Sequence, residues 1–465
     1  MLRSRLVAPL AAAALVFAVI VLVGDQPGMA QPAGQPLQDP PEYSSRDGVL
    51  PVRLVVERRR VVLAGRRLWA LTYNGFYMPP TLRFRPGDRM DLTMVNRLGS
   101  STNLHVHGLH VSPAGNSDDI FVHIQPGETY HYVYRFPDNL APGTYWYHSH
   151  AEHDSAGQVA GGMSGIIIVD GLQRYLPPDL KGITEHVIAL KDFQVDGDSI
   201  RTQNLHISSP TNRTVNGQVN PVIAIRPGET QLWRLANISA NIFYRLRLLG
   251  YRFHVIAQDA NPVSRVWSTD TIVIPAGARY DVLVQGGPPG RAPLETLVYD
   301  TGPAGDQFPQ QSLATLVSGG TPMVPAALPA SFAPMEDLAG APIAARRTIV
   351  FSENAAGTVF YVNGKVFDPT RVDVRSRLNT VEEWTVRNTS DEQHSFHLHT
   401  DAFQVMSIDG RPNHALSWQD TVTVPTRGQV TVRMKFTDFT GRTVYHCHIL
   451  NHEDKGMMAV LEIVN

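Results

Sequence analysis

The residues with the clearest chemical potential surround the only cysteine of the chain, close to its C-terminus. Cys447 stands between His446 and His448, and His452 and Met457 follow it five and ten residues later. A free cysteine is most often a small buried hydrophobic residue. A thiolate flanked by imidazoles and followed by a thioether is instead typical of a blue-copper electron-transfer site, which uses two His, one Cys and a weak axial Met. The sequence therefore predicts such a site.

The second imidazole of this site is predicted to be His394, at the start of a histidine-rich segment. The same segment contains one of four His-x-His pairs. Residues i and i+2 of a strand project from one face, so each pair presents two imidazoles to one place. Because imidazole is a favoured copper ligand, we expect eight histidines to hold a cluster of three coppers. The four pairs are His105/His107, His148/His150, His397/His399 and His446/His448.

The elements that must position these histidines belong to a sequence repeat of about 145 residues. An Asn-Gly turn recurs at Asn74, Asn216 and Asn363, and each is followed by an alternating strand that ends in Asn (91–96, 231–237 and 383–388). Short runs of β-branched and aromatic residues between Pro and Gly turns indicate antiparallel strands. A repeat of this length built from such strands predicts a β-sandwich, and the chain would contain three in series.

The first and third repeats match best where the histidines are, so the trinuclear cluster is expected at the interface of these two domains. Ser149 stands in the first repeat where the third has Cys447, so the first domain cannot provide the thiolate. The second repeat has the segment 243–248, with no histidine, in place of a His-x-His pair. We expect it to be metal-free and to act as a spacer between its neighbours.

The composition and the N-terminal sequence indicate which partners and which cellular location are compatible with the chain. A net charge of −2 gives no indication of a nucleic-acid partner. Residues 1–30 are predicted to be a signal peptide or a membrane anchor, because a basic start precedes a long apolar run. The protein would then be secreted, periplasmic or anchored to the outer face of a membrane. We expect a flexible linker over 31–48, followed by domains over 49–172, 173–335 and 336–465.

The four histidine motifs and the Cys447 segment resemble those of the multicopper oxidases, the family of laccases and bacterial cuprous oxidases. The resemblance covers residues from about 45 to 465 and implies three cupredoxin-like Greek-key β-sandwich domains with four copper ions. It implies that His105 and His397 bind the type 2 copper. The type 3 pair would take His107, His148, His150, His399, His446 and His448. The type 1 copper would take His394, Cys447, His452 and, as axial ligand, Met457.

The same resemblance implies one-electron oxidation of phenols or aromatic amines at the type 1 copper, coupled to four-electron reduction of O₂ to water. Because that reduction consumes protons, acids are expected beside the cluster. Glu453 follows the ligand His452 and is the first candidate. Asp118 is the second, with Asp119 as the close alternative. The expected partners are O₂ and a small-molecule or metal-ion reductant, with membrane attachment through the N-terminal apolar segment as a further possibility.

Three other functions compete with this one. A metallo-oxidase of Cu(I), Fe(II) or Mn(II) is the closest, although the twelve methionines are scattered rather than gathered in an insertion. Nitrite reduction on related domains is less compatible with a chain of this length. A copper-less structural relative would not need the intact ligand set. Eight further histidines lack partner spacing and are expected to have surface or structural roles: His110, His123, His131, His153, His186, His206, His254 and His414.

Overall fold

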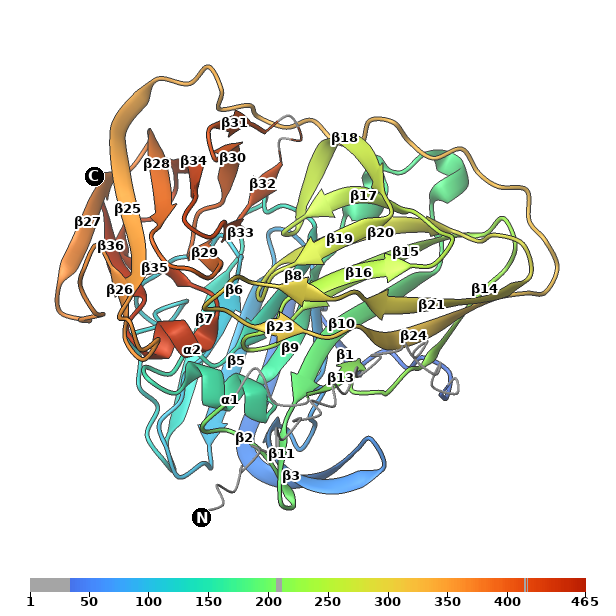
Figure 1. Ribbon diagram of the computed structural model, residues 1–465, viewed down its shortest axis with the longest axis horizontal. Coiled ribbons are helices and arrows are strands. Elements are labelled where there is room, and N and C mark those ends of the chain that lie inside the picture. The colour runs from blue at the N-terminus through green and yellow to red at the C-terminus, as the bar shows by residue number, and fades with distance from the viewer. Residues whose placement is uncertain (1–33, 206–210, 414, 416) are drawn as a thin grey trace, which may run out of the picture. The chain divides into compact units, whose positions relative to one another are not determined.

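Strands with alternating burial account for most of the fold. The computed structural model describes residues 34–205, 211–413, 415 and 417–465. These residues form three β-sandwiches in series, coloured blue to cyan, green to yellow and orange to red in Figure 1. The burial of Arg89–Asn96 and Gln429–Phe436 alternates residue by residue, as half-buried strands require. The predicted all-β class and the three-sandwich architecture are confirmed.

The first sandwich packs two sheets around one core of apolar side chains. The first sheet has the order β1 (Glu42–Ser44), β4 (Thr81–Phe84), β9 (Ser164–Val169), β8 (Gly143–His148) and β6 (His105–His107). The second has the order β11 (Val195–Asp196), β12 (Ser199–Ile200), β3 (Arg66–Tyr73), β2 (Val49–Leu63), β5 (Arg89–Asn96) and β7 (Thr129–Arg135).

The second sandwich is built in the same way. One sheet has the order β13 (Asn212–Val215), β10 (Glu185–Phe193), β15 (Thr230–Asn237), β20 (Arg279–Gln285), β17 (Phe253–Gln258) and β18 (Asn261–Thr269). The other has the order β14 (Val222–Ile225), β24 (Gln311–Ser318), β21 (Gly290–Thr296), β16 (Tyr244–Leu248) and β19 (Thr271–Ile274). A short ribbon joins β22 (Tyr299–Asp300) to β23 (Gln307–Phe308).

The third sandwich ends the chain. One sheet has the order β26 (Phe360–Val362), β25 (Ile343–Glu353), β28 (Thr380–Asn388), β34 (Gln429–Phe436), β30 (Phe403–Ile408) and β31 (Arg411–Pro412), with β32 (Trp418–Gln419) also on β30. The other has the order β27 (Val372–Arg377), β36 (Met458–Val464), β35 (Gly441–Cys447), β29 (His394–Leu398) and β33 (Thr421–Val424). The helices are α1 (Ser155–Gly161), η1 (Leu172–Tyr175), η2 (Pro178–Leu180) and α2 (Leu450–Asp454).

The sequence repeat corresponds to a structural one. In each sandwich the first long strand pairs in parallel with the strand that ends in Asn: β2 with β5, β10 with β15 and β25 with β28. Asn74, Asn216 and Asn363 adopt positive φ angles of 55°, 53° and 51° at their turns. Each also accepts, through its side-chain oxygen, a backbone N–H from that first strand. Asn tolerates the left-handed conformation, which explains why this residue recurs.

The structure departs from the predicted linker over 31–48, because residues 34–48 make regular backbone contacts. Leu37 donates its N–H to the carbonyl of Val222 at the edge of β14, and β1 pairs in parallel with β4. Two exposed sheet edges offer unpaired backbone groups, and pairing with them orders a Pro- and Gln-rich segment that has no core of its own. Residues 1–33 and the leader predicted there lie outside the described part of the chain.

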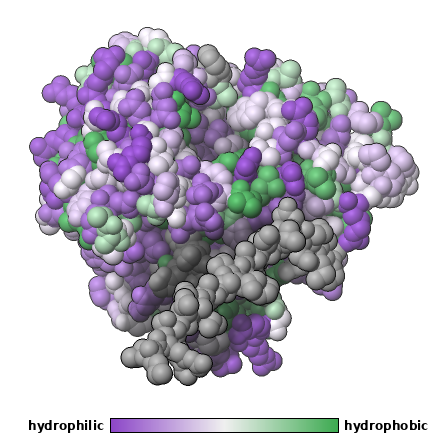
Figure 2. Space-filling model, in the orientation of Figure 1, coloured by the Kyte–Doolittle hydropathy of each residue, from purple (hydrophilic) through white to green (hydrophobic). Residues whose placement is uncertain are grey.

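Apolar side chains lie inside the three sandwiches, and hydrophilic residues predominate on the face shown in Figure 2. Four of the large hydrophobic side chains that remain exposed are Val62, Leu249, Val298 and Val324, which come from separate segments. Within the described residues, no helix has the length and apolar character needed to cross a lipid bilayer.

Candidate metal centre

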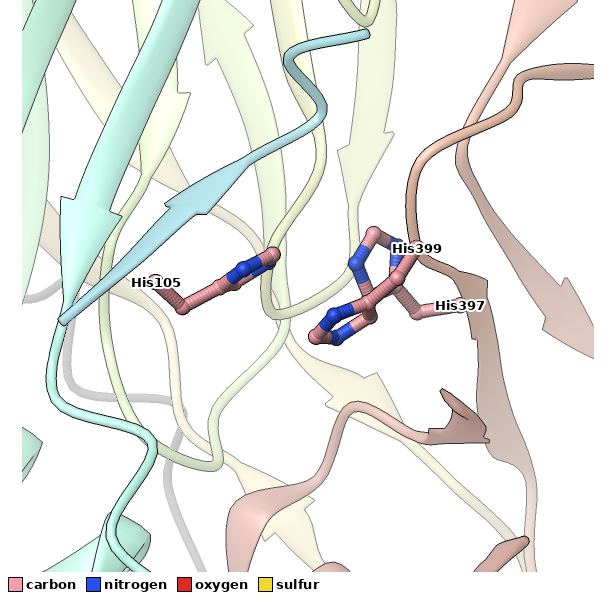
Figure 3. Close-up of side chains that lie close together, drawn as sticks. All are labelled: His105, His397 and His399. Atoms are coloured by element: carbon pink, nitrogen blue, oxygen red, sulfur yellow. The ribbon is translucent and has the colours of Figure 1, made fainter. Parts of the chain in front are cut away.

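The eight histidines of the four His-x-His pairs meet where the first sandwich faces the third. The sheet register is the same on both sides, since His105 lies opposite His148 and His397 lies opposite His446. All eight side chains are buried. The rings of His105 and His399 stack with centroids 3.9 Å apart, as do those of His107 and His397. Figure 3 shows His105 facing His397 and His399, which come from the other side of the cavity.

Hydrogen bonds at the rear of the rings fix which nitrogen faces the cavity. The Nδ1 atoms of His148, His397 and His446 lie 2.8–3.0 Å from the backbone carbonyls of Ser149, Asp420 and Cys447. A carbonyl oxygen can only accept a hydrogen bond, so each of these Nδ1 atoms must be protonated. The Nε2 atom of each neutral ring then keeps its lone pair. A ligand histidine in the same way donates the proton of one ring nitrogen to a neighbouring acceptor and binds the metal through the other nitrogen.

Several of these cavity nitrogens have no hydrogen-bond partner, although buried polar atoms are normally satisfied. They include Nε2 of His105, His148, His397 and His448 and Nδ1 of His107 and His399. Nε2 of His446 faces Nε2 of His399 at 3.1 Å and Nε2 of His150 at 3.4 Å. Burial lowers the pKa of His105, His107, His148, His399 and His448 well below its usual value, so these rings stay neutral. Converging neutral imidazoles fit a group of transition-metal ions.

The predicted blue-copper residues lie together in the third sandwich. Sγ of Cys447 lies 3.7 Å from Nδ1 of His394 and 3.8 Å from Nδ1 of His452, and these two nitrogens are 3.2 Å apart. Burial raises the pKa of the Cys447 thiol, so a bound metal would have to displace its proton. Met457 belongs to the same core cluster as Cys447, whereas Met458 packs with Ile120 and Val444. The two methionines therefore pack in different clusters, and the backbone N–H of Cys447 donates to the carbonyl of Met457.

The outer edge of this group is covered by three side chains. Phe360 stacks on the ring of His452, with centroids 4.0 Å apart. Oε1 of Glu392 lies 3.5 Å from Nε2 of His452, and Ser390 Oγ lies 3.1 Å from Nε2 of His394. Burial and the neighbouring Glu353 raise the pKa of Glu392 to about 9. The sequence analysis missed Glu392, because a single acid two residues before a ligand carries no motif.

Both predicted acids are buried against histidines of the cavity. Oε2 of Glu453 lies 3.0 Å from Nδ1 of His446, and its Oε1 lies 3.6 Å from Nδ1 of His150. Burial opposes ionisation of Glu453, but the two histidines hold its pKa down at about 2. Asp118 Oδ2 lies 2.9 Å from Nδ1 of His105. Burial raises the pKa of Asp118 to about 8.

Asp119, the alternative to Asp118, points elsewhere. Its Oδ1 accepts the backbone N–H of Phe121, and the residue is only half-buried. His153 is largely exposed, and its Nδ1 lies 3.1 Å from the carbonyl of Asp454. His110 bonds Thr400 and Asp438. None of the other histidines in the described ranges belongs to a cluster with metal-ligand spacing, and His206 and His414 lie outside those ranges.

One carboxylate beside the cavity was not found from the sequence. Asp420, just before β33, has its Oδ1 3.0 Å from Nε2 of His107, and it holds Nδ1 of His397 through its backbone carbonyl. Burial opposes its ionisation, but Arg279 holds the pKa of Asp420 down at about 2. Arg279 belongs to the second sandwich. No local pattern marks either residue, because Asp420 is 141 positions from Arg279 and 313 positions from His107.

Comparison with known proteins agrees with this geometry. Three family models, each described as multicopper oxidase, match residues 55–174, 185–290 and 341–465. The chain is 25% identical over 405 residues to the multicopper oxidase mco of Staphylococcus haemolyticus, covering 85% of this chain and 84% of the relative. It is 29% identical over 439 residues to the cell division protein FtsP of Escherichia coli, covering 90% of each.

A solved structure shows the same architecture. A multicopper oxidase from Campylobacter jejuni, described as a metallo-oxidase, superposes with a TM-score of 0.82 at 25% identity, covering 93% of this chain and 96% of that one. The three matched segments span all three sandwiches, including both histidine-bearing ones. This chain therefore belongs to the multicopper oxidase family.

Proposed function

We propose that this protein is an active copper-dependent oxidase that uses O₂ as electron acceptor. The observation that carries the proposal is the cavity of eight buried histidines, seven of which have a ring nitrogen without a hydrogen-bond partner. Eight imidazoles would bind three copper ions, with His105 and His397 on the type 2 ion and the other six on the type 3 pair. His394, Cys447, His452 and Met457 would bind the fourth, type 1, ion.

Bound copper would supply one-electron redox chemistry and the site at which O₂ is reduced. The chain connects the two sites covalently, since Cys447 is bonded to His446 and His448, and both histidines lie in the cavity. Glu453 contacts the far nitrogens of His446 and His150 and, as an ionised carboxylate, can accept protons and pass them on to that side. Asp118 contacts His105 and can deliver them to the other.

The relationship to FtsP raises a copper-less role as an alternative. A chain that no longer bound copper would have no reason to keep unpartnered buried nitrogens, because each one destabilises the fold unless a ligand satisfies it. All twelve predicted ligand residues are present and buried. This favours an enzyme over a purely structural protein.

For the reductant, we propose phenols or aromatic amines, because an aromatic cavity is connected through Tyr299 to the residue that precedes His394. It has a volume of about 350 Å³ and lies between the second and third sandwiches, where Trp267, Tyr280 and Tyr299 line it. Pockets of about 300 Å³ or more accommodate small organic ligands. The hydroxyl of Tyr299 donates a 2.6 Å hydrogen bond to Gln393, the residue before His394.

A second candidate reductant is a metal ion, Cu(I), Fe(II) or Mn(II). Glu392 provides a carboxyl oxygen 3.5 Å from the outer nitrogen of His452, and Glu353 is its neighbour. Carboxylates are suitable ligands for hard and borderline cations, and a bound cation would displace the proton that the raised pKa keeps on Glu392. A cation held there would lie one imidazole away from the type 1 copper.

Metal analysis and oxygen uptake test the proposal. The copper-loaded protein should contain four copper ions per chain and consume O₂ with a phenol, with a metal ion, or with both. Tyr299→Phe should raise the KM for phenols several-fold and leave metal-ion oxidation unchanged. Glu392→Gln should do the reverse. A chain that binds no copper in the cavity, or that binds it and consumes no O₂ with any reductant, would contradict the proposal.

The cellular location is proposed from the N-terminal sequence. A basic start and an apolar run would export the chain, so the copper sites would lie outside the cytoplasm. Fractionation of cells that express the full chain, with N-terminal sequencing of the mature protein, would show whether the segment is removed.

A further inference from the structure

The second sandwich reaches the histidine cavity through the turn that precedes β20. Gly277 in this turn has a φ of 92°, and a Cβ there would lie 3.0 Å from the ring of His448. Ser395, beside the ligand segment, donates its hydroxyl proton to the carbonyl of Ala276. Arg279, at the start of β20, is fully buried. The domain without a His-x-His pair therefore lies directly against the cavity.

Arg279 holds a carboxylate of the third sandwich with both ends of its guanidinium. Nη1 donates to Oδ1 of Asp420 at 2.7 Å, and Nη2 donates to Oδ2 at 2.6 Å. Parallel paired hydrogen bonds of this kind fix orientation as well as charge. Arg279 Nε also donates to the carbonyl of Thr144 in the first sandwich. One side chain thus joins all three domains.

Asp420 transmits this orientation to a predicted copper ligand. Its Oδ1 lies 3.0 Å from Nε2 of His107. The guanidinium of Arg279 keeps this carboxyl group ionised, so Oδ1 can only accept a hydrogen bond and Nε2 of His107 must donate it. The lone pair of His107 is then on Nδ1, which faces the cavity without a partner. By contrast, His105 turns Nδ1 to Asp118 and leaves Nε2 unpartnered.

The backbone beside His107 leaves room for this pair. Gly108 has a φ of 83°, and a Cβ at this position would collide with Oδ2 of Asp420 and Nη2 of Arg279. The glycine after the first His-x-His pair is therefore required by the ion pair as well as by its backbone conformation. Asp259 holds the backbone N–H groups of Asp420 and Thr421 from the second sandwich.

We propose that Arg279 is a positioning residue for the trinuclear site: it orients Asp420, and through Asp420 it sets the tautomer and ring orientation with which His107 binds copper. The second sandwich is then a structural part of the copper site rather than a spacer. This inference rests on the proposed function, because it assumes that the cavity binds copper.

The test compares Arg279→Lys with Arg234→Lys. Lysine keeps the charge and loses the paired hydrogen bonds. Arg234 is a matched control, because it is equally buried in the second sandwich and pairs with Glu185 and Asp281 without contacting a histidine. Each variant is titrated with a chelator at increasing concentration. The copper that remains in the trinuclear site is then measured from the copper content and from the type 2 electron paramagnetic resonance signal. The blue absorption of the type 1 site is the internal reference.

Arg279→Lys should bind trinuclear copper about 10–100-fold more weakly, as is typical when a partner of a ligand histidine is lost, with an altered type 2 signal and an unchanged blue band. Arg234→Lys should bind it as the wild type does. In metal-free protein, ¹⁵N shifts of His107 should show a proton on Nε2 in the wild type and a mixture of tautomers in Arg279→Lys. Equal retention in the two variants would overturn the inference.

If the arginine variants do not fold, a comparison of two glycine substitutions tests the same inference. Gly108→Ala inserts a methyl group between Arg279 and Asp420, whereas Gly127→Ala carries the same backbone strain, at a φ of 84°, with no atom within 4 Å. Only Gly108→Ala should lose trinuclear copper, and equal retention in both would overturn the inference. Wild-type protein that binds no copper in the cavity would instead refute the proposed function.

Discussion

Glu453 lies with Oε2 3.0 Å from Nδ1 of His446, on the side of the imidazole that faces away from the cavity. Its other oxygen lies 3.6 Å from His150, a histidine of the first sandwich. A single carboxylate therefore contacts predicted copper ligands from both domains. It also follows His452, a type 1 residue, in α2. This position suits a group that moves protons rather than electrons.

Glu453→Gln should slow reoxidation of the reduced enzyme by O₂ by about 10²–10⁴-fold, the usual contribution of a positioned acid or base. The amide keeps the shape of the side chain but cannot release and regain a proton. Stopped-flow mixing of anaerobically reduced enzyme with O₂ measures this step. Glu152→Gln, which changes a carboxyl farther from the cavity, is the control, and reoxidation at the wild-type rate would contradict the relay role.

Asp118→Asn should also slow reoxidation, whereas Asp119→Asn should not. Asp118 contacts His105 and the backbone of Val106, but Asp119 only caps the N–H of Phe121. We expect a loss of at least about 10²-fold for Asp118→Asn. The same stopped-flow experiment applies to both variants. Equal rates in the two would show that the proton path does not pass through Asp118.

Cys447→Ser should abolish the blue colour and oxidation of every reductant, because the absorption and the covalent path both require the sulfur. The eight-histidine cavity should still bind copper, since serine replaces cysteine without changing His446 or His448. Copper content should fall by one ion per chain. A blue or active variant would disprove the assignment of Cys447.

Met457→Leu should keep the blue colour and raise the reduction potential of the type 1 site, since the axial ligand tunes it. Leucine fills the space but offers no lone pair, which disfavours the oxidised ion. Met458→Leu is the control, because Met458 packs with Ile120 and Val444 in a different cluster from Cys447. Redox titration of the blue band compares the two, and a larger shift for Met458→Leu would reverse the assignment.

Removal of copper should make the protein acid-sensitive. Burial lowers the pKa of seven of the cavity histidines, to about 4 for His150, while an unfolded chain protonates its histidines near 6.5. Below about pH 6.5 the unfolded state therefore binds more protons than the folded state. The free energy of unfolding has its full value above that pH and decreases as the pH falls. Each such histidine lowers the free energy of unfolding by about 1.4 kcal/mol per pH unit between its unfolded and folded pKa values.

Urea unfolding of chelator-treated protein at pH 7.5 and 5.5 measures this effect, with the copper-loaded protein as control. The urea concentration at the midpoint of unfolding should be much lower at pH 5.5 than at pH 7.5 for the metal-free protein. Copper should make the two midpoints more similar, because bound imidazoles cannot be protonated. A metal-free midpoint that is independent of pH would show that the cavity histidines are already solvated.

The sequence by itself predicted the sandwich fold, and it selected the histidines and the cysteine that the structure brings together. His-x-His pairs and the Cys447 segment are local, and strand alternation forces residues i and i+2 to one face, so spacing alone predicts convergence. The recurring Asn74, Asn216 and Asn363 marked the repeat because a left-handed turn restricts the residue that can occupy it. These features depend on neighbours a few positions apart.

Tertiary structure decided the features that depend on distant residues. It placed Asp118 rather than Asp119 against His105, and it left Nδ1 rather than Nε2 of His107 without a partner. It also brought Arg279 and Asp420 together across 141 positions. Which rotamer and tautomer a side chain adopts is fixed by atoms that only folding places beside it, and no local spacing encodes them.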